Sequence, residues 1–233
     1  MRGITILLFA YNEEKNIANT IRVINSNIIK TKINYEIIVL NDASVDNTKK
    51  IVEVLKKKIK NLRLINFKKN EGITRSLKIG IKYSKFDKLT WFPGDNSFSS
   101  KNLKNFFLLS KKCDLVCGYR NNKKIFNFFR NFLSTLNQSF QSILFKQKIK
   151  DVHGIFVFTT KDLKKLKFFS NRYSLMIEIL PTILVNKRYK VEHCKVYVNQ
   201  NTVNSSGTLS YQTVLDFVLT WIKSFYYNKI KTT

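Results

Sequence analysis

Short apolar runs alternate with helical patterns along the first half of the chain. A continuous apolar run fills residues 4–9, strand-like segments rich in apolar residues lie at 35–40 and 62–67, and a fourth apolar run ends at Phe92. Runs of this kind are typical of strands that are buried on both faces of a parallel sheet. Between the first two runs, isoleucines recur at helical spacing from residue 17 to residue 28. The alternation predicts an α/β fold of βαβ units, in which helices flank a mostly parallel sheet.

Polar residues after the strands predict where the helices begin. We expect Asn12 to cap the first helix, with acidic residues in the first turn, where the helix dipole favours them. A third helix is expected from Ser76 to Tyr83, after a loop over residues 70–75. The second helix is rich in lysine, and its expected apolar face consists of Ile51, Val54, Leu55 and Ile59.

The second half of the chain predicts three more strands and two helical segments. Strands are expected near residues 114–120 and 155–158, and an alternating strand near residues 189–198. Residues 126–145 have the pattern of an amphipathic helix or helix pair, for which packing in the core is one interpretation. A last helical pattern fills most of residues 209–233. It either lies on an anionic membrane surface or packs against the sheet or a second subunit.

The chain length fits one domain with an appendage. We therefore expect a main domain over residues 1–208 and a helical appendage over residues 209–233. No stretch has the run of uncharged apolar residues that a transmembrane helix needs, and the first residues are too short for a signal sequence. Three cysteines without metal-binding spacing indicate reduced thiols, which fits a cytoplasmic protein.

Carboxylates and amides follow the predicted strands. Asp95 comes directly after an apolar run and a Pro-Gly turn, and Asp42 follows the second strand. In open α/β sheets the ligand crevice lies outside the carboxyl ends of the strands, so these side chains are expected at a binding edge. The alternatives are local: Asp95 bonds its own turn, and Asp42 or Asp46 caps the next helix.

The chain is strongly basic. It has 42 Lys plus Arg against 15 Asp plus Glu, which gives a formal net charge of +27. Such an excess indicates a polyanionic partner: nucleic acid, an anionic membrane face or phosphorylated small molecules. The alternative is a solvated surface in a chain whose whole composition is rich in Lys, Asn, Ile and Phe.

Four short segments, each after a predicted strand, carry a resemblance to a known family. They are Ala10–Glu14, Asn41–Thr48, Asn70–Gly72 and Gly94–Asp95. In this order they resemble the signature of family 2 glycosyltransferases, whose GT-A fold is a Rossmann-like, mostly parallel sheet flanked by helices. The dolichyl-phosphate-mannose synthase-like branch is the most similar one. The resemblance is close over the first half of the chain and looser to about residue 200.

The resemblance implies a donor site. It places Ala10, Tyr11 and Glu13 beside the donor nucleotide, Asp42 at the nucleobase, and Asn70 and Gly72 near the same ligand. The family's Asp-x-Asp motif, which binds a divalent metal and the sugar diphosphate, is incomplete here. Its first position is Pro93, whereas Asp95 keeps the second. Asp95, with an amide oxygen from Asn96, is the expected site for Mg²⁺ or Mn²⁺.

The resemblance also implies phosphate-binding and catalytic residues in the second half. Arg120, after Gly118, and Arg130 match positions that face phosphate groups, for which the planar arginine fork is suited. Asp151 matches a position near the sugar or acceptor, and Glu178 a position beneath the donor sugar. Either carboxylate is the candidate general base of an inverting transfer, and an acceptor phosphate needs no strong base.

The expected function is inverting transfer of a sugar from a UDP- or GDP-linked donor to a lipid-phosphate or glycan acceptor, in cell-envelope glycan synthesis. The protein is expected in the cytoplasm, with peripheral attachment to the inner face of the cell membrane.

Two other classes of protein stay open. The lost first Asp favours an inactive relative that binds a nucleotide sugar or a partner. The charge and a Phe count of 19 favour a nucleic-acid-binding protein, although no RNA-binding sheet motif is present and strand-end carboxylates repel phosphate.

Overall fold

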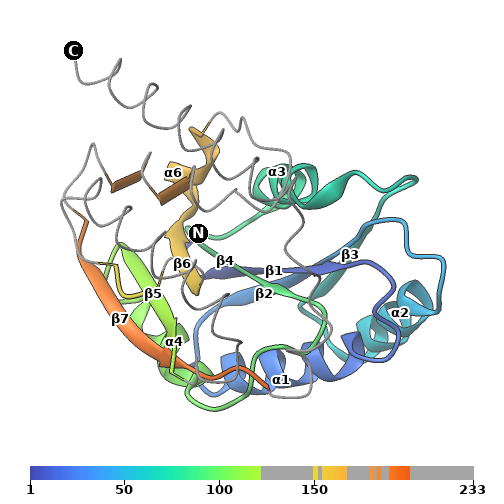
Figure 1. The fold of residues 1–233 in the computed structure, drawn as a ribbon, viewed down its shortest axis with the longest axis horizontal. Coiled ribbons are helices and arrows are strands. Elements are labelled where there is room, and N and C mark those ends of the chain that lie inside the picture. The colour runs from blue at the N-terminus through green and yellow to red at the C-terminus, as the bar shows by residue number, and fades with distance from the viewer. Residues whose placement is uncertain (122–148, 152–153, 167–178, 181–182, 185–188, 200–233) are drawn as a thin grey trace, which may run out of the picture.

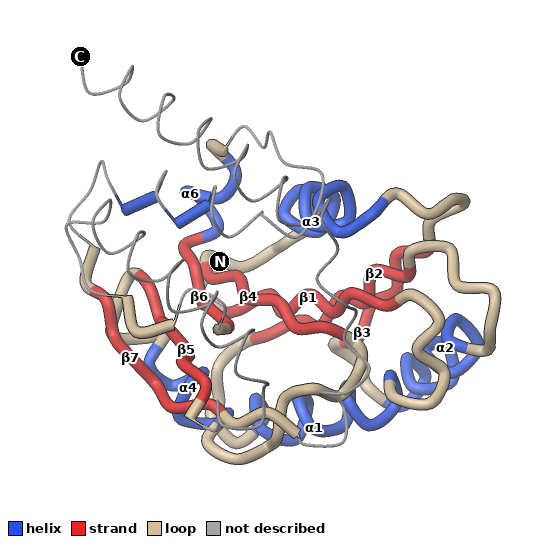
Figure 2. The backbone as a smooth tube through the Cα atoms, in the orientation of Figure 1, coloured by secondary structure: helices blue, strands red, loops and turns tan. Residues whose placement is uncertain are grey.

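The computed structural model describes residues 1–121, 149–151, 154–166, 179–180, 183–184 and 189–199. Their core is a seven-stranded sheet with the order β3-β2-β1-β4-β6-β5-β7 (Figure 1). Helices cover both faces of this sheet, which confirms the predicted α/β class (Figure 2). The expected helical segments at 126–145 and 209–233 lie outside the described residues.

The strands fall close to their expected positions. They are β1 (Ile4–Ala10), β2 (Tyr35–Asn41), β3 (Leu62–Asn66), β4 (Lys88–Pro93), β5 (Leu115–Arg120), β6 (Ile155–Thr159) and β7 (Val191–Val196). The helices are α1 (Ile17–Ile29), α2 (Thr48–Lys58), α3 (Gly72–Tyr83), α4 (Leu103–Leu109) and α6 (Thr160–Lys164).

Strand directions define two edges of the sheet. β1 pairs in parallel with β2 and β4, β2 with β3, and β5 with β7, whereas β6 is antiparallel to both β4 and β5. All described strands except β6 therefore end at one edge, which we call the carboxyl edge. We call the opposite edge the amino edge.

Two apolar layers hold the helices on the sheet. On one face, α1 and α2 pack through residues such as Ile21 and Val52 against β1 and β2, and α4 packs through Phe106 against β5 and β7. On the other face, α3 and α6 pack through Leu77 and Leu163, and Figure 1 shows the two groups of helices on opposite sides of the sheet. The central strands are buried on both faces, as their continuous apolar sequences predict.

Three helix predictions were wrong in detail. α1 begins at Ile17 with no acidic residue in its first turn, and Asn12 does not cap it. α3 begins at Gly72, four residues before the expected start. In α2, Val52 is buried and Val54 is 51% exposed. The first two errors share a cause, because bonds between distant loops decide both helix starts. Asn12 is bonded to the loop after β2, and the start of α3 is bonded to Asp42.

The cysteine prediction agrees with the structure. Cys113, Cys117 and Cys194 are all free and buried. Burial raises the pKa of the Cys117 thiol to about 12. These thiols are therefore inert core residues at neutral pH.

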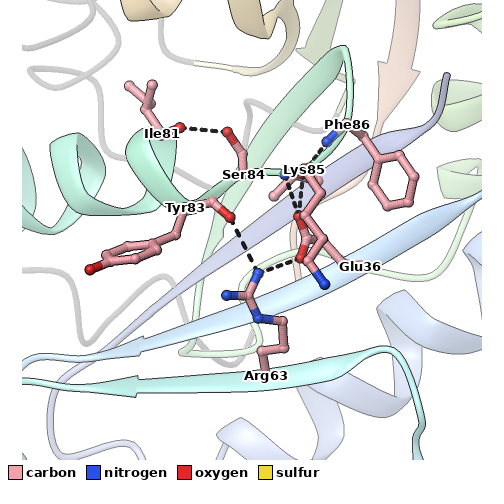
Figure 3. Close-up of polar contacts among 8 residues, drawn as sticks. Glu36, Arg63, Ile81, Tyr83, Ser84, Lys85 and Phe86 are labelled. Carbon is pink, nitrogen blue, oxygen red and sulfur yellow. Dashed lines mark hydrogen bonds and ion pairs between the residues drawn. The ribbon is translucent and has the colours of Figure 1, made fainter. Parts of the chain in front are cut away.

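A buried carboxylate ties the amino edge together (Figure 3). Glu36, at the start of β2, accepts hydrogen bonds from Thr5 Oγ1 at 2.8 Å, Arg63 Nη1 at 2.7 Å and the Lys85 backbone N–H at 2.7 Å. The Glu36 side chain is 5% exposed and that of Arg63 34%. One side chain thus joins the starts of β1, β2 and β3 to the segment before β4.

Within the described part of the chain, no helix combines the length and the apolar character that crossing a bilayer requires.

Candidate active site at the carboxyl edge

The loops that follow β1 and β2 are bonded to each other at the carboxyl edge. The Asn12 backbone N–H donates to Ser44 Oγ at 2.9 Å, and Asn12 Oδ1 accepts from the Val45 N–H at 2.9 Å. The Glu13 N–H donates to Thr48 Oγ1 at 2.8 Å. This reciprocal contact explains why Asn12 is not a helix cap, and it fixes the loop that presents Tyr11 and Glu13.

Asp46 anchors the same pair of loops. Its carboxylate accepts the Thr48 N–H at 2.9 Å and the Glu14 N–H at 3.0 Å. Partial desolvation acts to raise the pKa of Asp46, but these hydrogen bonds outweigh it, and the pKa is lowered. The bond to Thr48 lies at the start of α2, but the N-cap position of this helix is Asn47, so Asp46 holds the first helical N–H from one residue before the cap.

Asp42 lies at the end of β2 and is 8% exposed. Its carboxylate accepts the Glu71 N–H at 2.7 Å and the Gly72 N–H at 2.9 Å. It therefore caps α3, which follows β3, rather than the helix that comes next in the sequence. Gly72 has φ 78°, a backbone conformation that glycine adopts without steric cost. The contact brings the predicted donor residues Asp42 and Gly72 together, and Asn70 is exposed beside them.

Asp95 stands just beyond the end of β4, at the carboxyl edge, as the sequence predicted. The Gly94 N–H donates to Phe9 O at 2.7 Å, and a Cβ on Gly94 would approach that oxygen to 2.7 Å. Asp95 Oδ1 accepts the Ser97 N–H at 2.9 Å. The local-turn interpretation is thus correct for one oxygen of this carboxylate. Among the described residues, no donor to its other oxygen is seen.

Glu13 is electrostatically coupled to Asp95. Partial burial raises the pKa of Glu13, the hydrogen bond from Asn16 lowers it, and the carboxylates of Asp95 and Asp46 raise it further. The net direction is upward. The ends of β1 and β4 therefore bring the Asp95 carboxylate close enough to disfavour the charged form of Glu13.

The residues around Asp95 fit a divalent cation. Asn96 follows with φ 58°, and its Oδ1 is buried without a hydrogen-bond partner. Carboxylate and amide oxygens are the hard ligands that Mg²⁺ and Mn²⁺ prefer. Across the described residues, no three His, Cys, Asp or Glu side chains cluster to form a metal cage. A cation here would therefore take further oxygen ligands from water or from a bound phosphate.

Arg120 and Asp151, predicted as separate functional residues, form a buried ion pair. Arg120 Nε donates to Asp151 Oδ2 at 2.9 Å and Nη2 to Oδ1 at 3.0 Å. The Arg120 backbone N–H also donates to Oδ2, at 3.1 Å. The side chains are 12% and 1% exposed. The pair joins the end of β5 to the segment before β6, at the same edge as Asp95.

The other predicted site residues are placed as follows. Ala10 is buried at the end of β1, and Tyr11 is 50% exposed beside it. Arg130 and Glu178 lie outside the described residues. Sequence reasoning missed Ser44 and Thr48 as loop anchors. Their signal was present in the polar segment before α2, but their partners are more than thirty residues away.

The chain belongs to glycosyl transferase family 2, because the model of that family matches residues 5–166. This confirms the predicted family, and with it the prediction of a glycosyltransferase. The chain is 31% identical over 173 residues to an uncharacterised protein of Methanocaldococcus jannaschii, a match that covers 68% of this chain and 72% of the relative. It is 34% identical over 88 residues to the poly-beta-1,6-N-acetyl-D-glucosamine synthase of Staphylococcus aureus. That second match covers 37% of this chain and only 20% of the synthase.

Solved structures share the fold. The chain resembles glucosyl-3-phosphoglycerate synthase from Mycobacterium tuberculosis, in complex with Mn²⁺, UDP and phosphoglyceric acid, with a TM-score of 0.65 and 16% identity. This match covers 94% of this chain and 78% of the synthase. It also resembles S. aureus TarS residues 1–349 in complex with UDP-GlcNAc, with a TM-score of 0.58 and 16% identity, covering 94% of this chain and 65% of TarS.

Proposed function

We propose that this protein transfers a sugar, with inversion, from a nucleotide-diphosphate donor that binds at the carboxyl edge. The observation that carries the proposal is the gathering of Glu13, Asp42, Asp95 and the Arg120–Asp151 pair along one edge of the sheet. Family membership supports the reaction class, and solved neighbours with bound UDP or UDP-GlcNAc support a uridine nucleotide over a guanosine nucleotide.

The donor's parts match the chemistry along this edge. Tyr11 offers an exposed ring beside the loop that holds Glu13, and Asp42 offers carboxylate lone pairs to base or ribose donors. Asp95, Asn96 and the nearby Glu13 would hold Mg²⁺ or Mn²⁺, and the Mn²⁺ complex of the mycobacterial synthase supports that choice. The bound metal would supply positive charge that stabilises the diphosphate leaving group.

The Arg120–Asp151 pair supports a division of tasks. Arg120 is a cation at this edge with which a phosphate group would pair, and Asp151 fixes the guanidinium through two side-chain hydrogen bonds. Both Asp151 oxygens are committed to Arg120, so we assign Asp151 a positioning role. Glu178 is then the candidate base for a hydroxyl acceptor.

The acceptor proposed here is a lipid phosphate or a glycan, in cell-envelope glycan synthesis, with peripheral attachment to an anionic membrane. The lipid-phosphate option follows from the resemblance to the dolichyl-phosphate-mannose synthase-like branch. The glycan option is supported by the partial match to a polysaccharide synthase. An ionised lipid phosphate would attack without a base, whereas a glycan hydroxyl needs one.

The first experiment is calorimetric titration with UDP-sugars and GDP-sugars, with and without Mn²⁺. We expect Mn²⁺-dependent binding of a UDP-sugar that Asp95→Ala weakens by about tenfold or more, the loss of one charge-assisted ligand. Glu53→Ala is the matched control, because Glu53 is an exposed carboxylate on α2, paired only with Lys56 at 3.5 Å.

Three results would contradict the proposal. An equal loss of donor affinity in Asp95→Ala and Glu53→Ala would mean that donor binding depends on the net charge of the protein and not on Asp95 itself. Absence of binding to any donor, together with salt-sensitive binding to DNA, would favour the nucleic-acid class. Donor binding without transfer to any acceptor would favour the inactive relative that Pro93 suggests.

A further inference from the structure

Basic side chains line the whole amino edge of the sheet. The turns before β3, β2 and β1 carry Lys60, Lys32 and Arg2. The segments before β4 and β5 carry Lys85 and Lys112. All five side chains are exposed.

The same edge continues across the last two strands. Lys161 follows the end of antiparallel β6, and Lys190 precedes β7, and both are exposed. Every strand of the sheet therefore presents an exposed cation at this edge.

Backbone hydrogen bonds show that these segments are neighbours in space. Ile37 N–H donates to Asn61 O at 2.9 Å, next to Lys60, and Ile4 N–H donates to Asn34 O at 2.9 Å, near Lys32. Thr160 N–H donates to Asp87 O at 2.8 Å, which places Lys161 beside the segment before β4. The cations before the strands therefore form a row along the amino edge.

Acidic residues also lie at the amino edge. Glu36 is buried and bonded to Arg63. Asp87 accepts the Gly3 N–H at 2.7 Å, and Asp114 accepts the Lys190 N–H at 2.9 Å. These carboxylates are engaged in hydrogen bonds, and the exposed cations of the row outnumber them.

Apolar side chains stand exposed among the cations. Met1 is 87% exposed, Ile29 at the end of α1 is 54% exposed, and Tyr83 at the end of α3 is 48% exposed. Lysine stems with neighbouring apolar and tyrosine side chains suit a membrane interface, where charges meet headgroups and apolar tips enter the boundary. Nucleic-acid surfaces rely more on the arginine fork and on stacking rings.

We propose that the amino edge is a docking surface for an anionic lipid bilayer. The occupant follows from charge complementarity along the row and from the apolar residues within it. Lysines near such a surface each add to the attraction, and the attraction falls as salt screens it.

Docking of the amino edge on a membrane bears on which acceptor the protein uses. This inference about the acceptor rests on the proposed function. The seven residues of β1 span about 20 Å, so the carboxyl edge is held about that far from the headgroups. A sugar chain that projects from the membrane reaches this height, whereas a phosphate at headgroup level does not. Docking therefore favours the glycan acceptor over the lipid phosphate.

The test is co-sedimentation with vesicles of phosphatidylcholine alone and of phosphatidylcholine with phosphatidylglycerol. The amino-edge variant replaces Lys32, Lys60, Lys85 and Lys112 with Gln. The matched control replaces Lys49, Lys50, Lys68 and Lys69 with Gln, four exposed lysines near the carboxyl edge, so that both proteins have the same net charge.

We expect binding to the anionic vesicles only, and a loss of about tenfold or more in the amino-edge variant with little change in the control. Equal losses in both variants, or no vesicle binding by the wild-type protein, would overturn the proposal. Tighter binding to DNA than to vesicles, lost in the amino-edge variant, would assign the surface to nucleic acid instead. Donor titration is independent of this assay, so failure of the proposed function leaves the docking result unchanged.

Discussion

Carboxylates at the carboxyl edge differ in how many bonds they already make. Asp42, Asp46 and Asp151 accept backbone or guanidinium hydrogens on both oxygens. Glu13 and Asp95 make fewer such hydrogen bonds, and Asp95 disfavours the charged form of Glu13. We therefore expect added ligands to act most strongly on Glu13 and Asp95.

The raised pKa of Glu13 predicts a pH-dependent stability. Its ordinary pKa is 4.5, and the folded-state value is higher, so the folded protein binds the proton more tightly than the unfolded chain does. This stabilisation is fully present below the unfolded pKa and is lost as the pH rises through the folded pKa. Glu13→Gln removes the titration, so the variant should gain about 2 °C or more in melting temperature over wild type as the pH rises above that range.

The measurement is thermal unfolding of both proteins in a buffer with EDTA, from about pH 4 to about pH 8. Glu53→Gln serves as the control, since Glu53 is exposed. A constant difference between Glu13→Gln and wild type at every pH would contradict the assignment.

At the scale of elements, α3 depends on the end of β2. Asp42 caps α3 through the Glu71 and Gly72 N–H groups, and the turn requires φ 78° at Gly72. The cap and the glycine occur at the same residue, because the Gly72 N–H bonds Asp42 and the Gly72 backbone is left-handed.

Gly72→Ala should therefore destabilise the protein by about 1 kcal/mol or more, the cost of a left-handed conformation for a residue with a Cβ. Gly72→Asn should cost less, since asparagine tolerates this conformation better. Urea unfolding measures both. Equal stability of the alanine variant and wild type would mean that the helix start adapts without strain.

Local patterns predicted most of the fold, and non-local bonds account for the errors. Strands buried on both faces leave long apolar runs, so β1 and β2 were predicted correctly. β3, a partly buried border strand, and β4 were predicted from shorter apolar segments, and the shared edge follows from their order. The start of α3 was not, because its cap comes from Asp42, about thirty residues earlier. The Arg120–Asp151 contact likewise joins residues 31 positions apart and leaves no periodic signal. The sequence analysis predicted both residues as site residues, but it did not predict that they contact each other.

At the scale of the whole molecule, a residue important for stability lies at the amino edge, whereas the proposed donor site lies at the carboxyl edge. Glu36 joins three strand starts there, remote from the carboxyl edge. Glu36→Ala leaves the Thr5 hydroxyl and the Lys85 N–H without this acceptor, and Arg63 loses its ion pair but keeps its hydrogen bond to Tyr83 O at 3.2 Å. We expect a loss of about 2 kcal/mol in unfolding free energy, a moderate value because Arg63 is 34% exposed.

The same variant should keep the donor affinity of wild type, measured by calorimetry at a temperature where both proteins are folded. Glu36→Gln should lose less stability, because the amide oxygen still accepts a hydrogen bond. A fall in donor affinity in Glu36→Ala would show that the two edges are coupled.

The position of β1 in the sheet sets an order of events during synthesis. This first strand lies in the interior of the sheet, bonded to β2 on one side and to β4 on the other. A nascent chain that ends before Lys88 has β2 available but not β4, so one side of β1 still lacks its backbone partner. That open side is an apolar, aggregation-prone template until the ribosome has released Lys88–Pro93. Slow translation of the region between β2 and β4 would therefore lengthen the time at risk, whereas delays after β4 would not.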